Sequence, residues 1–480
     1  MNEPSGQTAF SSIATYAIAI ALLCAPVLWN GFPLMFDDVG GYLERWPTGT
    51  LGQGRSAVYG LLLWISRGSS FVPVVLLQAL VTTFVVDRAL TLFAPRTPRS
   101  PWLLPVVIAA ISMTSGVALF VSKILPDAWA APAVLSLHLL AWYRDRLTRL
   151  ECIAMAAIIA FAGASHMATF GVLAGLSVLN GIAWLARRKL QLAPTGIVNS
   201  TVAVWSGLAL LLIVNVVVAG RLSLTPGGEV FLLGRMIEDG TADRTLREEC
   251  PRADWHLCDF RTELPDYAEA FIFDANSPLQ KIGGGNDPRA RSEIASIILT
   301  SIRRHPIDHL GQAIALTARQ FVDVGTGGAM EPLMAQHARW IFTLYAPKMI
   351  PAFDAARQQT GSVDVSRWSD WVVVPMSIVA AFALPALAVV LWRAGRRRDA
   401  LLPAMLFLAL LGNAAICGFT IGSSDRYQAR LVWLAPLTIG LLMRSSLRRE
   451  FGREAGFGVT GAGDGGAAAS AHAGPSSVAT

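Results

Sequence analysis

The stretch SIATYAIAIALLCAPVLWNGFPLMFDD, residues 12–38, decides the fold of this chain. It is apolar for at least the roughly 20 residues that a helix needs to cross a bilayer, and it ends in two adjacent acids, Asp37 and Asp38. No basic segment precedes it and no small-residue cleavage site closes it, so we expect a retained first helix. Ionisable groups beside hydrocarbon are costly to place and are usually functional. The stretch therefore predicts a membrane helix that ends in functional acidic residues.

The composition points the same way. Charged residues make up 15% of the 480 positions and hydrophobic residues 53%, with a mean hydropathy of +0.49. This is too little charge to coat a soluble globule, so we predict a polytopic α-helical membrane protein. The net charge of +6 comes from arginines clustered in short loops. Membrane topology explains these clusters, and we expect membrane lipids but no nucleic acid as partners.

Apolar runs recur along the chain and predict about ten transmembrane helices. Their approximate limits are 12–35, 71–93, 102–122, 126–142, 151–167, 169–186, 196–220, 367–393, 400–420 and 430–444. The segment Ala57 to Trp64 is too short to span, and it suits a helix lying in the membrane interface.

The loops between these spans alternate in charge. One side carries dense basic clusters, namely Arg96, Arg99, Arg144, Arg146, Arg149, Arg187, Arg188, Lys189, Arg393, Arg396, Arg397, Arg398, Arg444, Arg448 and Arg449. The short loops of the other side carry only Arg45, Arg55, Arg67, Lys123, Arg426 and Arg430. The positive-inside rule predicts that both termini are cytoplasmic and that the acid pair lies outside.

Four regions follow from this topology. Residues 1–220 form a transmembrane module whose first outer loop is 36–70, and residues 367–450 form the C-terminal transmembrane helices. Between the seventh and eighth spans, 221–366 is mixed in composition and long enough for an extracytoplasmic α or α+β domain. The Gly-, Ala- and Ser-rich segment 455–480 predicts a disordered cytoplasmic tail.

Cys250 and Cys258 are the two of five cysteines that fall outside the membrane on this topology, and they are close in sequence. Because extracytoplasmic compartments are oxidising, they predict a disulfide.

Polar residues gather at the outer ends of the spans. Four groups carry them: Asp37 and Asp38 with Tyr42, Trp46 and Arg55; Lys123 with Asp127; His166; and Asp425, Arg426 and Tyr427 with Arg430. For any single group, the polarity of a loop or the anchoring of arginine at lipid headgroups is a sufficient explanation. A shared pocket formed by all four would indicate function.

The segment from Asp37-Asp38 through Gly41-Tyr42 and Trp46 to Gly54-Arg55 is similar to the first loop of bacterial glucosyltransferases that decorate O-antigen. Asp425-Arg426-Tyr427 resembles the final loop of mannosyl- and aminoarabinosyl-transferases. The chain thus resembles the GT-C superfamily of integral-membrane glycosyltransferases over about half its length. The resemblance implies a sugar donor on a polyprenyl phosphate, a periplasmic active site in the bacterial inner membrane, and a glycan, lipid or protein acceptor.

Such a transfer needs a carboxylate to take the proton of the acceptor hydroxyl and cations to hold the departing phosphate. We predict Asp37 as the base, with Asp38 beside it as a neighbour or metal ligand. For the phosphate, the candidates are Arg426, Arg430, Lys123 and Arg55. Residues predicted to orient the acceptor or complete the site are Asp127, His166, Tyr42, Trp46, Tyr427 and Asp425. The family that the chain resembles includes both metal-dependent and metal-independent members, and Asp38, Asp127 and His166 are the candidate ligands if a divalent metal is bound.

Two other classes stay open. A lipid-linked glycan polymerase or ligase has a similar number of spans and one large outer loop, but it leaves the acid pair without a role. A transporter or flippase places charges near the bilayer midplane, whereas these spans are nearly free of charge.

Overall fold

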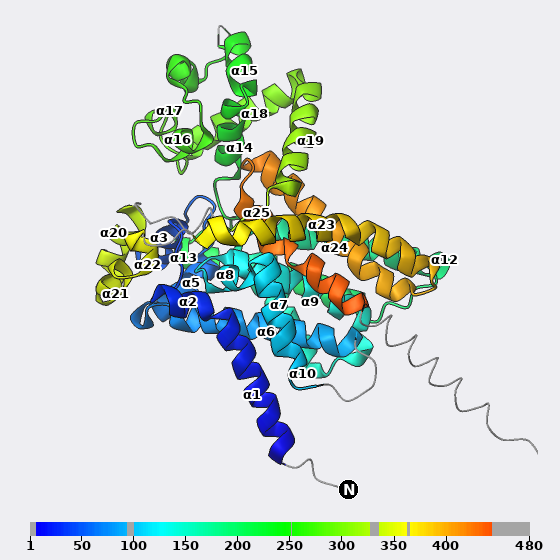
Figure 1. Ribbon diagram of the computed structural model, residues 1–480. Coiled ribbons are helices and arrows are strands. Elements are labelled where there is room, and N and C mark those ends of the chain that lie inside the picture. The colour runs from blue at the N-terminus through cyan, green and yellow to red at the C-terminus, as the bar shows by residue number, and fades with distance from the viewer. Residues whose placement is uncertain (1–5, 94–99, 251, 327–335, 362–364, 444–480) are drawn as a thin grey trace, which may run out of the picture.

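In the computed structural model, the chain is described at residues 6–93, 100–250, 252–326, 336–361 and 365–443. The predicted tail 455–480 and the basic residues Arg96, Arg99, Arg444, Arg448 and Arg449 lie outside these ranges. The described residues fold into helices (Figure 1), and among them only two isolated β-bridges occur, Leu34 with Lys123 and Gly52 with Arg55.

Within the described part of the chain, five helices are long and apolar enough to cross a membrane, as a helical membrane protein requires. They are α6 (Val72–Phe93), α11 (Met167–Leu185), α13 (Ile197–Ala219), α23 (Val365–Arg393, apolar from Ser369) and α24 (Arg397–Thr420). Each coincides with a predicted span.

Other predicted spans are divided into shorter helices. In the first, 12–35, α1 (Gly6–Leu23) gives way to α2 (Ala25–Asn30), which has a proline in its first turn. In the third, 102–122, Gly116 adopts a left-handed φ of 67° between α7 (Leu103–Ser115) and α8 (Val117–Ser122). Prolines and left-handed glycines interrupt helical hydrogen bonding, so apolar length alone overestimates the continuity of these segments.

The remaining predicted spans are also short helices. The fourth, 126–142, consists of the 3₁₀ turn Pro126–Trp129 followed by α9 (Ala130–Tyr143), and the fifth is α10 (Arg149–Ser165). The last, 430–444, begins within α25 (Asp425–Val432), which a turn at Trp433 separates from a helix at 434–443.

Helix α9 lies at the centre of the bundle. All of its residues, 130–143, are buried, and it contacts α6, α10, α11, α13, α24 and α25. A helix that is apolar on every face is stable only when protein surrounds it. Asp127, one turn before α9, is therefore carried into the interior of the protein, where it is 3% exposed.

The basic clusters of three loops lie together at one end of the bundle. Arg397 donates to the carbonyl of Leu190, at the end of α12 (Arg187–Leu190), and Arg398 pairs with Asp145 of the 3₁₀ turn Arg144–Arg146. Figure 1 places α12 at the opposite end of the bundle from α3 (Asp38–Leu43). The loops that alternate in charge along the chain therefore also separate in space.

The first outer loop folds into α3, α4 (Arg45–Thr48) and α5 (Ala57–Ser66), which is followed by the 3₁₀ turn Arg67–Ser69. The short helix predicted from Ala57 is present, and Ser56 caps it by accepting a hydrogen bond from the backbone N–H of Val58. Such a cap satisfies a donor that the helix itself cannot pair.

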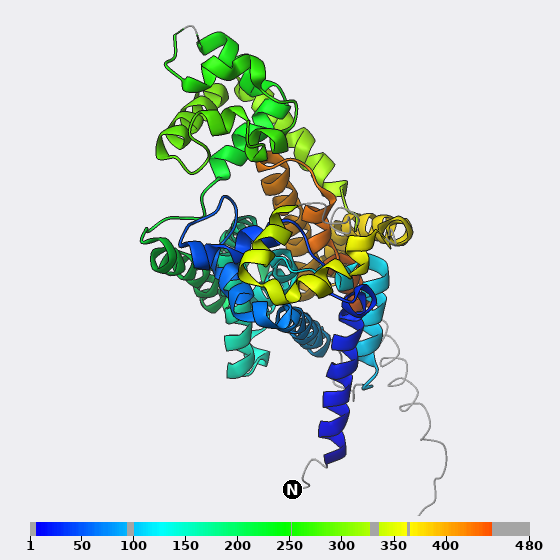
Figure 2. The same ribbon diagram turned by 90° about the vertical axis from the view of Figure 1, so that its left-hand side faces the viewer.

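Residues of the predicted outer region 221–366 form two units. The first has its own apolar core and projects from the bundle (Figures 1 and 2), which it contacts at α24. We call it the outer domain; it comprises α14 (Gly228–Glu238), α15 (Thr241–Glu249), the 3₁₀ segment His256–Glu263, α16 (Ala268–Phe273), α17 (Pro278–Lys281), α18 (Pro288–Arg304) and α19 (Pro306–Val322). Among its described residues there is no strand, so of the two predicted types it is α.

The second unit packs against the bundle. It consists of α20 (Gln336–Tyr345), the 3₁₀ turn Pro347–Met349, α21 (Ile350–Asp354) and α22 (Arg357–Thr360). Helix α20 packs on α3, and the Gln358 amide bonds the backbone of Met35 through both N–H and C=O. The segment thereby fixes the start of the first outer loop.

Cys250 and Cys258 of the outer domain form the predicted disulfide, with Cα atoms 5.5 Å apart. Replacing both by Ser is expected to lower the free energy of unfolding of this domain by about 2–3 kcal/mol, because the closed loop is short. Mass spectrometry after alkylation of unreduced, denatured protein is expected to find label on the free thiols Cys24, Cys152 and Cys417 only. Label on Cys250 and Cys258 in exported wild-type protein would contradict the bond. The Cys152→Ser variant, which leaves the disulfide intact, is the matched control.

Candidate active site

Asp38 begins α3 and lies between two arginines that come from distant parts of the sequence. Its Oδ1 accepts a hydrogen bond from Arg55 Nη2 at 2.5 Å, and its Oδ2 accepts one from Arg426 Nη1 at 3.3 Å. Arg426 lies on α25 and also stacks over the ring of Phe36, 4.2 Å from its centroid. The structure thus joins the first and the last of the four predicted polar groups through one carboxylate.

Glycines permit this arrangement at two positions. A Cβ atom on Gly41 would lie 2.6 Å from Arg55 Cδ, so a larger residue would push the arginine side chain away from Asp38. Gly54 has a φ of +69°, a conformation that other residues rarely adopt, and its N–H bonds the carbonyl of Pro226. These constraints explain the Gly-Tyr and Gly-Arg pairs of the first outer loop.

The charges around Asp38 keep it ionised. Burial alone raises the pKa of the Asp38 carboxyl, but the guanidinium groups of Arg55 and Arg426 together hold that pKa below its usual range. At neutral pH the group is therefore a carboxylate.

Arg430, one turn along α25 from Arg426, points into the protein interior. It is 1% exposed and donates to Asp127 Oδ1 at 2.7 Å, His166 Nδ1 at 3.1 Å and Asn413 Oδ1 at 2.7 Å. His166 also lies 3.3 Å from the hydroxyl of Thr169. This network connects the second and third predicted polar groups to the fourth.

A cavity of about 1090 Å³ lies between the membrane helices and the outer domain. The predicted site residues that line it are Asp38, Tyr42, Arg55, Asp127, His166, Arg426 and Tyr427. They come from all four predicted groups, so the tertiary structure brings those groups to one space. Its far wall is formed by the outer domain, including Phe231, Arg235 and Phe273.

Five predicted site residues do not line this cavity. The Asp37 carboxylate accepts a hydrogen bond from the N–H of Ala338 at 3.3 Å, and the indole N–H of Trp46 donates to the carbonyl of Ala57 at 2.8 Å. Lys123 is 2% exposed, with its ammonium group 4.7 Å from the ring centroid of Phe120.

The other two lie on α25. Asp425 is in its first turn, against Gly325, where a Cβ atom would lie 2.7 Å from Asp425 Oδ2. Arg430 occupies the buried network. Of the two arginines predicted to point at one phosphate, Arg426 lines the cavity and Arg430 does not.

The predicted metal ligands Asp38, Asp127 and His166 all line the cavity. Within the described part of the chain, no group of three or more His, Cys, Asp and Glu side chains is arranged to hold a metal ion. Asp38 and Asp127 are each paired with arginine.

Sequence reasoning missed the residues that the outer domain contributes, above all Arg235. One signal was present, because Arg235 interrupts the apolar run Phe231-Leu232-Leu233 and Met236-Ile237 of α14. A charged residue within the buried stripe of an amphipathic helix is unusual unless it is paired or functional.

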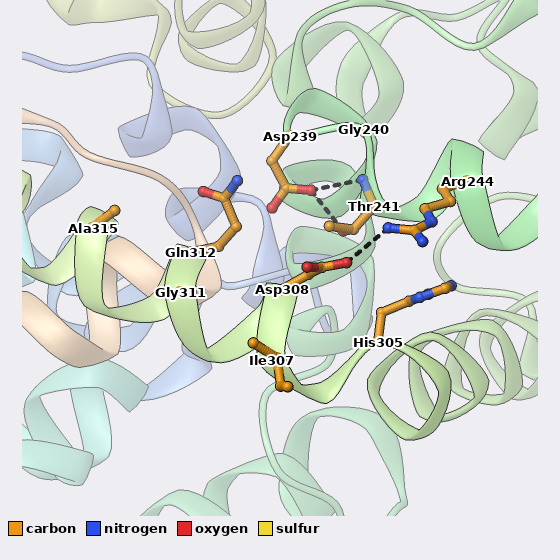
Figure 3. A pocket seen from close by; sticks show the side chains of 10 residues that line it. All are labelled: Asp239, Gly240, Thr241, Arg244, His305, Ile307, Asp308, Gly311, Gln312 and Ala315. Carbon is orange, nitrogen blue, oxygen red and sulfur yellow. Dashed lines mark hydrogen bonds and ion pairs between the residues drawn. The ribbon is translucent and has the colours of Figure 1, made fainter.

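A second, smaller cavity of about 520 Å³ lies in the outer domain (Figure 3). Arg244 and Asp308 form an ion pair of 2.8 Å on its wall, beside His305. Asp239 lines both cavities, and it accepts hydrogen bonds from the N–H and the hydroxyl of Thr241, at 3.0 and 2.6 Å.

Comparisons with protein-family models, curated proteins and solved structures find no match to this chain.

Proposed function

We propose that this protein is an integral-membrane glycosyltransferase of the GT-C type, which moves a sugar from a polyprenyl phosphate to an acceptor hydroxyl. The observation that carries the proposal is Asp38, a carboxylate held between Arg55 and Arg426 on the wall of a large cavity beside the membrane helices. Acid and cation in one cavity are the two groups that this transfer needs.

The geometry favours Asp38 over its neighbour Asp37 as the base. Asp38 lines the cavity, whereas Asp37 is bonded to the backbone of Ala338 outside it. In the proposed step Asp38 takes the proton of the acceptor hydroxyl as the oxygen of that hydroxyl attacks the anomeric carbon. The bond between that carbon and the phosphate oxygen breaks, and its electron pair stays on the phosphate.

Arg426 links donor binding to this step. Its guanidinium now bonds Asp38, and the donor phosphate competes with Asp38 for the same cation. When Arg426 turns to the phosphate, Asp38 loses one of the charges that lower its pKa and becomes a stronger base. Arg430 and Asp127 act as positioning residues, since their network fixes α25 and hence Arg426.

The proposal includes the membrane topology. Ten crossings, with both termini in the cytoplasm and the cavity on the periplasmic face of the bacterial inner membrane, agree with the separation of basic loops from α3 (Figure 1).

A polymerase or ligase that transfers whole glycans from the same lipid carrier is the second candidate. Such an enzyme is expected to rely on outer-loop arginines and a histidine, so the presence of His166 in the cavity favours it. The direct test incubates the protein in lipid nanodiscs with lipid-linked sugars and a membrane extract as acceptor. The proposed function requires release of polyprenyl phosphate and a gain of one sugar by the acceptor. A gain of many sugars would select the polymerase, and no release would contradict both.

Replacing Arg426 by Lys is expected to weaken donor binding and to lower the transfer rate, because lysine lacks the bidentate hydrogen-bonding fork of arginine. The expected loss of transition-state stabilisation is about 1–3 kcal/mol. Radiolabelled donor binding and initial rates measure both effects. Arg67→Lys is the matched control, since Arg67 also stacks on an aromatic ring, that of Trp64, but does not line the cavity. Equal losses of donor affinity and transfer rate in the two variants would show that Arg426 only anchors its helix.

A further inference from the structure

Arg235 of the outer domain lines the same cavity. It is 2% exposed, and its guanidinium lies over the ring of Phe419 of α24, 5.1 Å from the centroid. Its Nη1 is paired with Asp239, but Nε and Nη2 have no hydrogen-bond partner among the described residues. Asp239 thus holds the guanidinium through Nη1, and the opposite edge, formed by Nε and Nη2, remains unpaired within the described residues.

The two vacant nitrogens lie on one edge of the guanidinium. Nε–H and Nη2–H point the same way and form the fork that binds both oxygens of a carboxylate or phosphate. Buried donors of a charged group are costly when left without an acceptor. Both nitrogens are buried, and they belong to a residue that lines a cavity, so this edge is suited to an oxyanion that enters with a ligand.

This edge is separate from the cations assigned to the donor. Arg55 and Arg426 share Asp38 and approach from the first outer loop and α25, whereas Arg235 belongs to α14. Because the donor phosphate is assigned to Arg426 of α25, a second anion at Arg235 is assigned to the other substrate.

We propose that Arg235 forms a second oxyanion site, which binds a carboxylate or phosphate group on the acceptor. The inference rests on the proposed function and names its acceptor class, an anionic glycan or glycolipid. Asp239, held by Thr241, orients the guanidinium and leaves it able to take one further anion.

The test uses small probes of matched shape and the full chain in nanodiscs. Saturation-transfer NMR compares methyl glucuronide, which carries a carboxylate, with uncharged methyl glucoside, and inorganic phosphate is added as competitor. We expect methyl glucuronide to bind the wild-type protein at least tenfold more tightly than methyl glucoside. Phosphate displacing it would show that the site also accepts a phosphate group.

Variants locate this binding. Arg235→Gln is expected to weaken methyl glucuronide at least tenfold, while Arg244→Gln, at an exposed arginine of the smaller cavity (Figure 3), leaves it unchanged. Asp239→Asn removes the internal anion that competes for Arg235, so it is expected to tighten methyl glucuronide severalfold. Misfolding cannot produce a gain of affinity for methyl glucuronide. The Asp239→Asn variant therefore still tests the site if Arg235→Gln is unstable.

Titration with polyprenyl phosphate separates this inference from the proposed function. Its affinity is expected to be unchanged in Arg235→Gln. Equal binding of methyl glucuronide and methyl glucoside, or anion binding that does not respond to Arg235 and Asp239, would overturn the oxyanion site. Loss of polyprenyl phosphate binding in Arg235→Gln would place Arg235 in the donor site and overturn its assignment to the acceptor. Absence of sugar transfer together with Arg235-dependent anion binding would overturn the proposed function alone.

Discussion

Replacing Asp38 by Asn is expected to lower the rate of sugar transfer about a hundredfold or more, because the amide keeps the shape of the carboxylate but cannot accept the proton. Arg55 and Arg426 lose their shared anion in this variant, so donor-phosphate binding is expected to be kept or strengthened. A fall in rate without a loss of donor affinity distinguishes a missing base from a damaged site. Initial rates and equilibrium binding of the polyprenyl phosphate sugar measure the two effects.

Asp37→Asn is the matched control for this experiment. The two acids are adjacent, but Asp37 accepts only a 3.3 Å hydrogen bond from the backbone of Ala338 and does not line the cavity. We expect near wild-type rates. If Asp37→Asn abolished transfer and Asp38→Asn did not, the original sequence prediction of Asp37 as base would hold and the assignment from the cavity would fail.

Replacing Arg430 by Gln is expected to destabilise the protein by about 3–5 kcal/mol, because it leaves the buried carboxylate of Asp127 without its cation. Arg430 also donates to His166 and Asn413, so the substitution removes hydrogen bonds to three separate segments of the chain. Denaturant unfolding in detergent micelles, followed by tryptophan fluorescence, measures the change in free energy.

The double variant with Asp127→Asn tests the reason for this loss. Removing both charges leaves no unpaired ion in the interior, so the double variant is expected to be more stable than Arg430→Gln alone. Additive losses would show that the two side chains do not act as a pair. A stable and active Arg430→Gln variant would contradict the network itself and reopen Arg430 as a ligand of the donor phosphate.

Rules that depend on length and composition predicted much of the fold. Apolar runs of about 20 residues located the five long helices, and close spacing in an outer segment predicted the bond between Cys250 and Cys258. The same rules did not detect the breaks at Gly116 and Trp433, because hydropathy does not report where helical hydrogen bonding stops.

The sequence by itself determined that the chain is helical and apolar enough for a membrane, and that polar residues gather at the ends of its helices. Only the tertiary structure decided their roles. Asp37 and Asp38 are neighbours in sequence, yet the start of α3 directs just one of them to the cavity.

Arg426 and Arg430 illustrate the same limit. Their spacing of one helical turn predicted a shared face, but the interior position of Asp127 draws Arg430 into the bundle and leaves Arg426 at the cavity. Arg235 reaches that cavity only because the outer domain packs on α24. Helical period and apolar length act over a few residues and are visible in the sequence, whereas a site assembled from residues hundreds of positions apart depends on how the helices pack.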